Sequence, residues 1–176
     1  MLNNQKGARA SMSILRRYWR IIFPIFFVAV IWMFSSHNGD VSDNESLFFA
    51  SLFGISNGLI RKFAHFFLFG ALGYSTTSFI KGLHPLTFPK HTHVFYPVIV
   101  TVIYGALDEV HQLTIAGRSG QASDVLIDAL AGIAGVLAYI AYFCFYRLWR
   151  AKRAAVKAVI DEQQANIQDL IQDKTA

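Results

Sequence analysis

The chain has 176 residues, of which 54% are hydrophobic and 15% aromatic, whereas only 15% are charged. A soluble domain carries about 25% charged residues, so the composition excludes an ordinary soluble globular protein and indicates a membrane protein. The formal net charge is +5, and the single cysteine, Cys144, excludes an intramolecular disulfide.

The N-terminal residues, 1–17, are polar and basic and are predicted to lie in the cytoplasm. The apolar run over residues 18–34 just reaches the lower limit of about 17–25 residues that a membrane helix needs. Pro24 is expected near the start of this helix, where its missing N–H costs least. No signal-peptide cleavage site follows, so the run is predicted to be a retained anchor.

The next apolar stretch, residues 47–60, is short and interrupted by glycines, which predicts an interfacial or re-entrant segment. A second membrane span is predicted over residues 63–80. Arg61 and Lys62 open it, and His65 lies one turn beyond Arg61 on the same helical face.

The third predicted span covers residues 94–113, begins apolar and ends polar. Its polar side chains recur at spacings of three and four, which places them on one helical face. They are Thr101, Tyr104, Asp108 and Gln112, with His111 as the alternative to Gln112.

The fourth predicted span covers residues 123–149 and begins with Asp124 and Asp128, one turn apart. Small residues continue that side of the helix, and two more lie in the second span, where they would permit close helix contact. These glycines are Gly70, Gly73, Gly132 and Gly135.

Three regions follow: a basic N-terminus over residues 1–17, a transmembrane domain over 18–149 and a polar or amphipathic tail helix over 150–176. The fold class is therefore all-α, a polytopic membrane protein with four transmembrane helices. The tail helix is predicted to be cytoplasmic, where it could contact a protein partner. No nucleic-acid partner is predicted.

Most of the basic residues lie in the two termini and in the loop over residues 81–93. Basic residues concentrate on the cytoplasmic side of membranes, so both termini are predicted to be inside. The start of the second span, the end of the third and the start of the fourth then lie near the outer face.

This topology brings polar side chains from three helices and one loop to one depth, which predicts a polar pocket open to the extracytoplasmic side. Ionisable groups inside a membrane are costly and usually functional. The residues expected there are Arg61, Lys62, His65, Asp108, Glu109, His111, Gln112, Arg118, Ser119, Asp124 and Asp128. The central ones are predicted to be His65, Asp108, Glu109, Arg118 and Asp128.

Two stretches, RKFAHFFLFGALG at 61–73 and DEVHQLTIAGRSGQASDVLIDALAGIAG at 108–135, resemble the signature blocks of the VanZ-like family. Phe34-Ser35-Ser36 is similar to a third, weaker block, and the resemblance covers about residues 20–148. It implies a small multi-pass protein of the bacterial cytoplasmic membrane. The family's namesake is associated with resistance to the lipoglycopeptide teicoplanin.

The first functional hypothesis is binding of an amphiphile, namely a lipid-linked envelope intermediate, a phospholipid or a lipoglycopeptide. Arg61, Lys62 and Arg118 would contact an acidic head group, because a guanidinium can bind it with two hydrogen bonds. The other residues assigned to ligand binding are Gln112, Ser119, Asp124 and Asp128.

The second hypothesis is a membrane-embedded hydrolase or transferase, in which Glu109 or Asp108 forms an acid–base pair with His65 or His111. Ser119 and Ser123 are candidate nucleophiles, although no known nucleophile motif surrounds them. No cofactor is predicted. A divalent metal is an option, but the sequence has no closed ligand set such as H-E-x-x-H.

The charged residues have two further interpretations. The charged residues could form a self-contained ion-pair network that only joins the helices, as buried acids and bases do. A proton or ion path is disfavoured, because the inner halves of the spans are apolar. A network combined with a ligand site is favoured over a network alone.

Overall fold

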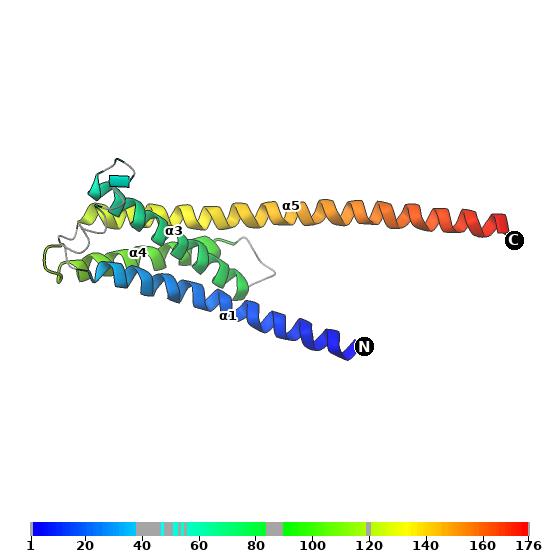
Figure 1. The fold of residues 1–176 in the computed structure, drawn as a ribbon, viewed down its shortest axis with the longest axis horizontal. Helices are drawn as coiled ribbons and strands as arrows, with labels where there is room; N and C mark the ends of the chain where they lie inside the picture. The colour runs from blue at the N-terminus through cyan, green and yellow to red at the C-terminus, as the bar shows by residue number, and fades with distance from the viewer. Residues whose placement is uncertain are drawn as a thin grey trace. The chain divides into compact units, whose positions relative to one another are not determined.

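A computed structural model describes residues 2–37, 47, 51–52, 54, 56–83, 90–118 and 121–175. Within these residues the regular structure is entirely helical (Figure 1). The helices are α1 (Leu2–Ser35), α3 (Asn57–Leu83), α4 (Thr92–Gln112) and α5 (Ala122–Thr175). The predicted all-α class is confirmed for this part of the chain. Most of the predicted interfacial segment lies outside the described residues.

Three of these helices are long and apolar enough to cross a bilayer, over Tyr18–Ser35, Thr92–Gln112 and within Ala122–Asp173. α3 is not among them. His65 and the hydroxyl side chains from Ser75 to Ser78 interrupt its apolar sequence. Three of the four predicted spans are therefore supported by length and composition.

The described chain divides into two compact units, Met1–Tyr139 and Ile140–Ala176. The first unit holds α1, α3, α4 and the first part of α5 (Figure 1). Within it α3 contacts both α1 and α4, and α1 also contacts α4. α5 contacts α3 and α4 through its glycines.

The glycines of α3 and α5 make the close helix contact that their spacing predicts. A Cβ atom on Gly73 would overlap the carbonyl of Gly132, and one on Gly135 would overlap the carbonyl of Gly70. A Cβ on Gly132 of α5 would overlap the side chain of Thr101 in α4. Backbones approach this closely only where a side chain is missing.

The interior of the first unit is unusually polar. Its buried apolar cluster is small: Ile31, Phe69, Leu72 and Ala131. Buried polar side chains fill much of the rest: Ser75, Thr76, Thr77, Thr101, Asp108, Glu109, Gln112 and Asp128. Large apolar side chains face outward instead; Phe67 is 72% exposed. A lipid environment suits this distribution, because outward-facing apolar side chains need no burial there.

One local prediction was wrong. α1 begins at Leu2, so Pro24 lies in the helix interior and not near its start. The reason is that helical backbone continues through the polar residues that precede the apolar run. Proline at this position cannot donate to the carbonyl four residues earlier, which belongs to Arg20.

The second unit is the remainder of α5, a helix whose side chains are mostly exposed. The Arg153 guanidinium lies 4.0 Å from the centre of the Trp149 ring, and that of Arg150 lies 6.0 Å from the centre of the Tyr146 ring. Aromatic and basic side chains paired in this way are typical of a membrane–water interface.

Candidate functional site

The ends of four helices meet at one end of the first unit. His111, in the last turn of α4, lies 3.1 Å from the hydroxyl of Ser36, which follows α1. Lys62, near the start of α3, lies 3.7 Å from the carboxylate of Asp124 in the first turn of α5. The two polar sequence blocks, more than forty residues apart, therefore lie together.

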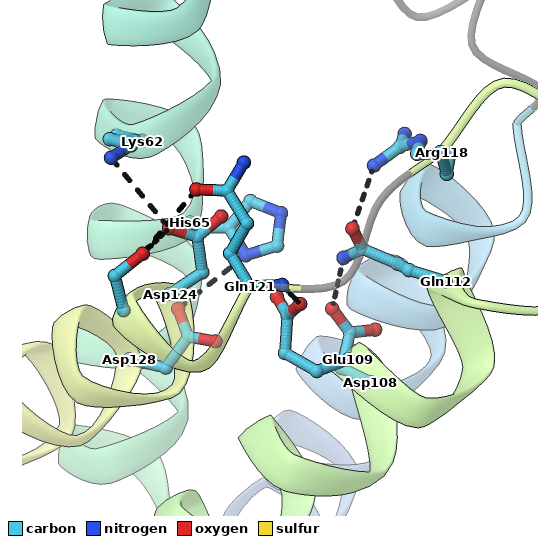
Figure 2. Close-up of polar contacts among 10 residues, drawn as sticks. Lys62, His65, Asp108, Glu109, Gln112, Arg118, Gln121, Asp124 and Asp128 are labelled. Atoms are coloured by element: carbon cyan, nitrogen blue, oxygen red, sulfur yellow. Dashed lines mark hydrogen bonds and ion pairs between the residues drawn. The ribbon is translucent and has the colours of Figure 1, made fainter.

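A cavity of about 130 Å³ lies among these helix ends, and we call it the polar pocket. Six of its lining residues were predicted from the sequence: Arg61, Lys62, His65, Gln112, Asp124 and Asp128. Four were not: Gly58, Gly117, Gln121 and Ile127. The side chains that contribute most of its polarity are shown in Figure 2.

His65 and Asp128 form the most buried pair of ionisable side chains in the pocket. Asp128 is completely buried, and its Oδ1 lies 3.4 Å from Nδ1 of His65. The His65 ring is held against Phe69, with ring centres 6.0 Å apart and planes inclined by 18°. In contrast, the side chains of Lys62 and Asp124 are 46% and 27% exposed, and solvent-exposed pairs of this kind contribute little stability.

Asp108 and Glu109 do not line the pocket, but each accepts a hydrogen bond from a glutamine that does (Figure 2). The Gln112 side-chain amide donates to Asp108 Oδ2 at 2.9 Å. The backbone N–H of Gln121 donates to Glu109 Oε2 at 2.7 Å. The geometry gives these two acids a positioning role, because the glutamines that they hold are the residues that line the pocket.

Arg118 directs its guanidinium toward the end of α1. It donates to the carbonyl oxygens of Phe34 at 3.1 Å and His37 at 3.3 Å, and to Gln112 Oε1 at 3.4 Å. The last carbonyls of a helix have no partner within the helix, and a basic side chain can satisfy them. The short Phe34-Ser35-Ser36 block thereby joins the other two polar blocks.

His111 faces α1 and does not line the polar pocket. Its ring stacks on Trp32, with centres 3.9 Å apart and planes inclined by 17°. The Ser36 hydroxyl donates to the carbonyl of Trp32 at 2.7 Å, and a hydroxyl has a single proton. His111 therefore acts as donor to Ser36, which is not the arrangement of a base that activates a nucleophile.

Several buried carboxylate oxygens have no hydrogen-bond partner among the described residues. They are both oxygens of Asp128, Oδ1 of Asp108 and Oε1 of Glu109. A buried polar atom without a partner costs about 1–3 kcal/mol, and a charged one more. The contacts described above therefore leave the polar network incomplete.

The contact made by Gln121 was missed because it uses the backbone, and a backbone contact leaves no signal in residue type. Gly117 has a φ of 75°, a left-handed conformation that glycine adopts without strain. It bends the chain after α4 so that residue 121 can return to Glu109. The only sequence feature that could have indicated this contact is that Gln121 directly follows the glycine-containing loop over residues 117–120.

The remaining predicted residues carry less evidence. Ser119 lies outside the described residues. The Ser123 hydroxyl donates at 3.2 Å to Asp124 Oδ1 and is exposed. Within the described parts of the chain, no three His, Cys, Asp or Glu side chains are grouped so as to hold a metal ion.

The family model described as VanZ/LLP1 matches residues 20–147, which contain the whole polar pocket. No curated protein and no solved structure matches the chain. Because the matched segment covers well over half of the sequence and includes every helix that forms the site, the chain belongs to the VanZ/LLP1 family.

Proposed function

We propose that this membrane protein binds the polar head group of an amphiphilic cell-envelope molecule in the polar pocket. The candidates are a lipid-linked intermediate, a phospholipid or a lipoglycopeptide. The apolar part of the molecule would lie against the outward-facing aromatic side chains of the helices.

The observation that carries this proposal is the state of Asp128. It is completely buried and lines the cavity, its Oδ1 is paired with His65 Nδ1 at 3.4 Å, and its Oδ2 has no hydrogen-bond partner among the described residues. A network whose only task is to join helices should satisfy all of its own buried polar atoms. A ligand that donates a hydrogen bond to Asp128 would complete this one.

The lining residues indicate the chemistry of the head group. Arg61 and Lys62 offer donors and positive charge, whereas Asp124 and Asp128 offer acceptors. A head group that combines an acceptor, such as a phosphate or carbonyl oxygen, with a donor, such as an amide, hydroxyl or ammonium group, satisfies both sets. A purely anionic group would leave Asp128 Oδ2 without a donor.

The size of the cavity limits what enters it. One water occupies about 30 Å³ of liquid volume, so 130 Å³ corresponds to roughly four water-sized groups. A phosphate or the end of a short peptide fits this space. A molecule as large as a lipoglycopeptide would place one substituent in the pocket.

The proposal includes a fourth span, over residues 63–80 of α3, and both termini in the cytoplasm. Two observations support α3 as a span. It contacts α1 and α4 directly, and its glycines meet α5. Between Lys62 and Lys81 its only titratable side chains are those of His65 and Tyr74. With both termini inside, the polar pocket faces the extracytoplasmic side.

A hydrolase or transferase is the second candidate, favoured by the buried His65–Asp128 pair beside the cavity. Such a pair can move a proton to or from a bound group. Mass spectrometry of envelope lipids incubated with the purified protein, with and without chelator, separates the two functions. Binding alone leaves the lipids unchanged.

The substitution Asp128→Asn tests the binding proposal. Asparagine has nearly the same shape but no charge, so it is cheaper to bury, and it offers a ligand donor one neutral and weaker acceptor oxygen in place of a carboxylate. We expect the amount of amphiphile bound from an envelope lipid extract to fall by roughly tenfold. Native mass spectrometry of the full chain in detergent measures it. The temperature of half-unfolding should stay unchanged or rise.

A matched control is Asp161→Asn, which makes the same change in the second unit and should alter neither measurement. If Asp128→Asn instead lowers the unfolding temperature and leaves the amount of bound amphiphile unchanged, the polar residues form a structural network only. That result would reject the proposal.

A further inference from the structure

A second and larger cavity lies in the first unit, between α1, α3 and α5. Its volume is about 670 Å³, which falls within the range of about 300–1,000 Å³ that is typical of ligand sites. It shares no lining residue with the polar pocket. It is therefore a separate feature of the molecule, outside the site that we propose for the head group.

Aromatic side chains form the walls of this cavity, and small side chains form its floor. The aromatic walls come from Trp19, Phe23 and Phe27 of α1 and from Phe66 and Phe67 of α3. The floor includes Ala131, Ala134 and Ala138 of α5. The result is an apolar trough, which we call the lipid groove.

The small residues of the groove are already partly explained by helix packing. A Cβ on Gly135 would overlap the Gly70 carbonyl, so these glycines serve the contact between α3 and α5. They give no evidence for a further helix. What helix packing leaves unexplained is the aromatic trough itself and the charge at one end of it.

That charge comes from Arg20, which lines the groove. Its guanidinium lies over Gly82, where an added Cβ would be 2.8 Å from Nη1 and 2.9 Å from Cδ of Arg20. Lys81 precedes Gly82 and follows the proposed span. Its pKa is lowered by burial and by the positive charge of Arg20. Two cations therefore lie close enough to repel each other at this end.

An anion placed between Arg20 and Lys81 would relieve this repulsion. Ser78, one turn before Gly82, lines the same groove and adds a hydroxyl. α3 begins at the polar pocket and Lys81 lies in its last turn, so this basic end lies at the opposite end of the helix. In the proposed orientation it falls in the cytoplasmic leaflet, where anionic lipids attract basic residues.

We propose that the lipid groove binds an anionic phospholipid, with one acyl chain in the aromatic trough and the phosphate between Arg20 and Lys81. The charge at the end of the groove favours this occupant over a helix of a second copy, which would gain nothing from two adjacent cations. The proposal is independent of what the polar pocket binds.

Tryptophan fluorescence tests the proposal, because Trp19 lines the groove. Trp32→Phe and Trp149→Phe together leave Trp19 as the only tryptophan of the full chain. The protein is reconstituted in phosphatidylcholine vesicles that contain equal minor fractions of either brominated phosphatidylglycerol or brominated phosphatidylcholine. Bromine on the acyl chain quenches a tryptophan that it contacts. We expect stronger quenching by the phosphatidylglycerol, with a local enrichment of roughly fivefold for each basic residue.

Variants in the Trp19 protein localise the effect. Arg20→Gln with Lys81→Gln should make quenching by the two lipids equal, whereas Arg20→Lys should retain the preference. Arg150→Gln with Arg153→Gln, a matched loss of charge elsewhere, should change nothing. Ala134→Phe fills the groove and should reduce quenching by both lipids, whereas Ala106→Phe, on an exposed face of α4, should not.

Three outcomes would overturn the proposal. Equal quenching by both lipids in the unsubstituted Trp19 protein would exclude head-group selection. A preference that survives Arg20→Gln with Lys81→Gln would place the selection elsewhere. If neither lipid quenches Trp19, the groove is covered by protein, and a helix of a second copy is its occupant.

Discussion

The acidic residues of the site have different roles, because their carboxylate oxygens have different partners. Asp128 lines the polar pocket, whereas Asp108 and Glu109 each hold a glutamine that lines it. Only their contacts distinguish the three acids, because all three are buried and each has an oxygen without a hydrogen-bond partner among the described residues. The positioning role of Glu109 makes a prediction that does not depend on the identity of the ligand.

The prediction compares Glu109→Ala with Glu109→Gln. Alanine removes the acceptor of the Gln121 backbone N–H, whereas glutamine keeps an acceptor oxygen at nearly the same place. We expect amide hydrogen exchange at residue 121 to be roughly tenfold faster in Glu109→Ala, because a hydrogen bond to a carboxylate stabilises by about 1.5–3 kcal/mol. Glu109→Gln should exchange nearly as slowly as the unsubstituted protein.

Equal exchange at residue 121 in all three proteins would contradict the positioning role. Amides within the second unit, for example at Val156, serve as the internal control, because they lie outside the unit that contains Glu109.

At this scale the sequence predicted which residues gather, but not how they point. Six of the predicted residues line the pocket because helical periodicity and topology decide which residues share a face and a depth. The directions of Arg118 and His111 toward α1 depend on the carbonyls of Phe34 and His37 and on the ring of Trp32. These partners lie more than seventy residues earlier, and no local pattern indicates them.

Among the helices, α3 is the one on which the others depend. It contacts α1 and α4, and its glycines meet those of α5, so its packing sets the positions of both the polar pocket and the lipid groove. Its glycine contacts are unequal. A Cβ on Gly70 would lie 3.4 Å from the Ala131 carbonyl, an ordinary contact, whereas one on Gly135 would overlap the Gly70 carbonyl.

This difference predicts opposite results for two alanine substitutions in the same interface. Gly135→Ala should lower the free energy of unfolding in detergent micelles by about 1–3 kcal/mol, because backbone atoms cannot move aside cheaply. Gly70→Ala should be neutral or stabilising by up to about 1 kcal/mol, because alanine favours the helix. Similar losses in both variants would show that α3 and α5 are not packed as described.

The elements were predicted well where the sequence is apolar and less well where it is polar. Helix ends that border loops were predicted to within a few residues, except at the start of α3, which begins six residues before the predicted span. The sequence reading did not find that α1 begins at Leu2. Hydropathy reports what lies in the membrane, whereas a helix continues for as long as its residues favour it. The residues after 150, rich in Ala, Gln and Lys, are good helix formers, and α5 runs through them to Thr175.

For the whole molecule, the outward-facing apolar side chains and the polar interior imply a lipid surround, and the proposed fourth span would determine which end faces which compartment. The topology can be checked with single cysteines introduced after Cys144→Ser. Thr114→Cys, beside the polar pocket, should react with a membrane-impermeant maleimide in intact cells. His91→Cys, before α4, and Lys157→Cys, in the second unit, should react only after the membrane is opened.

Labelling of positions 114 and 91 from the same side would show that α4 does not cross the membrane. Labelling of 114 only after permeabilisation, with 91 accessible in intact cells, would invert the proposed orientation and move the polar pocket to the cytoplasm.

The hydrogen bonds from Arg118 to the end of α1 have a consequence for the molecule as a whole. Arg118 also contacts Gln112, which lines the polar pocket, while Trp19 and Arg20, in the middle of α1, line the lipid groove. One helix is thus linked to both proposed binding regions. If occupancy of the pocket shifts α1, the groove's affinity for its lipid changes, and thermodynamic reciprocity requires the lipid to change the pocket's affinity by the same factor. Membrane composition in one leaflet would then tune recognition in the other.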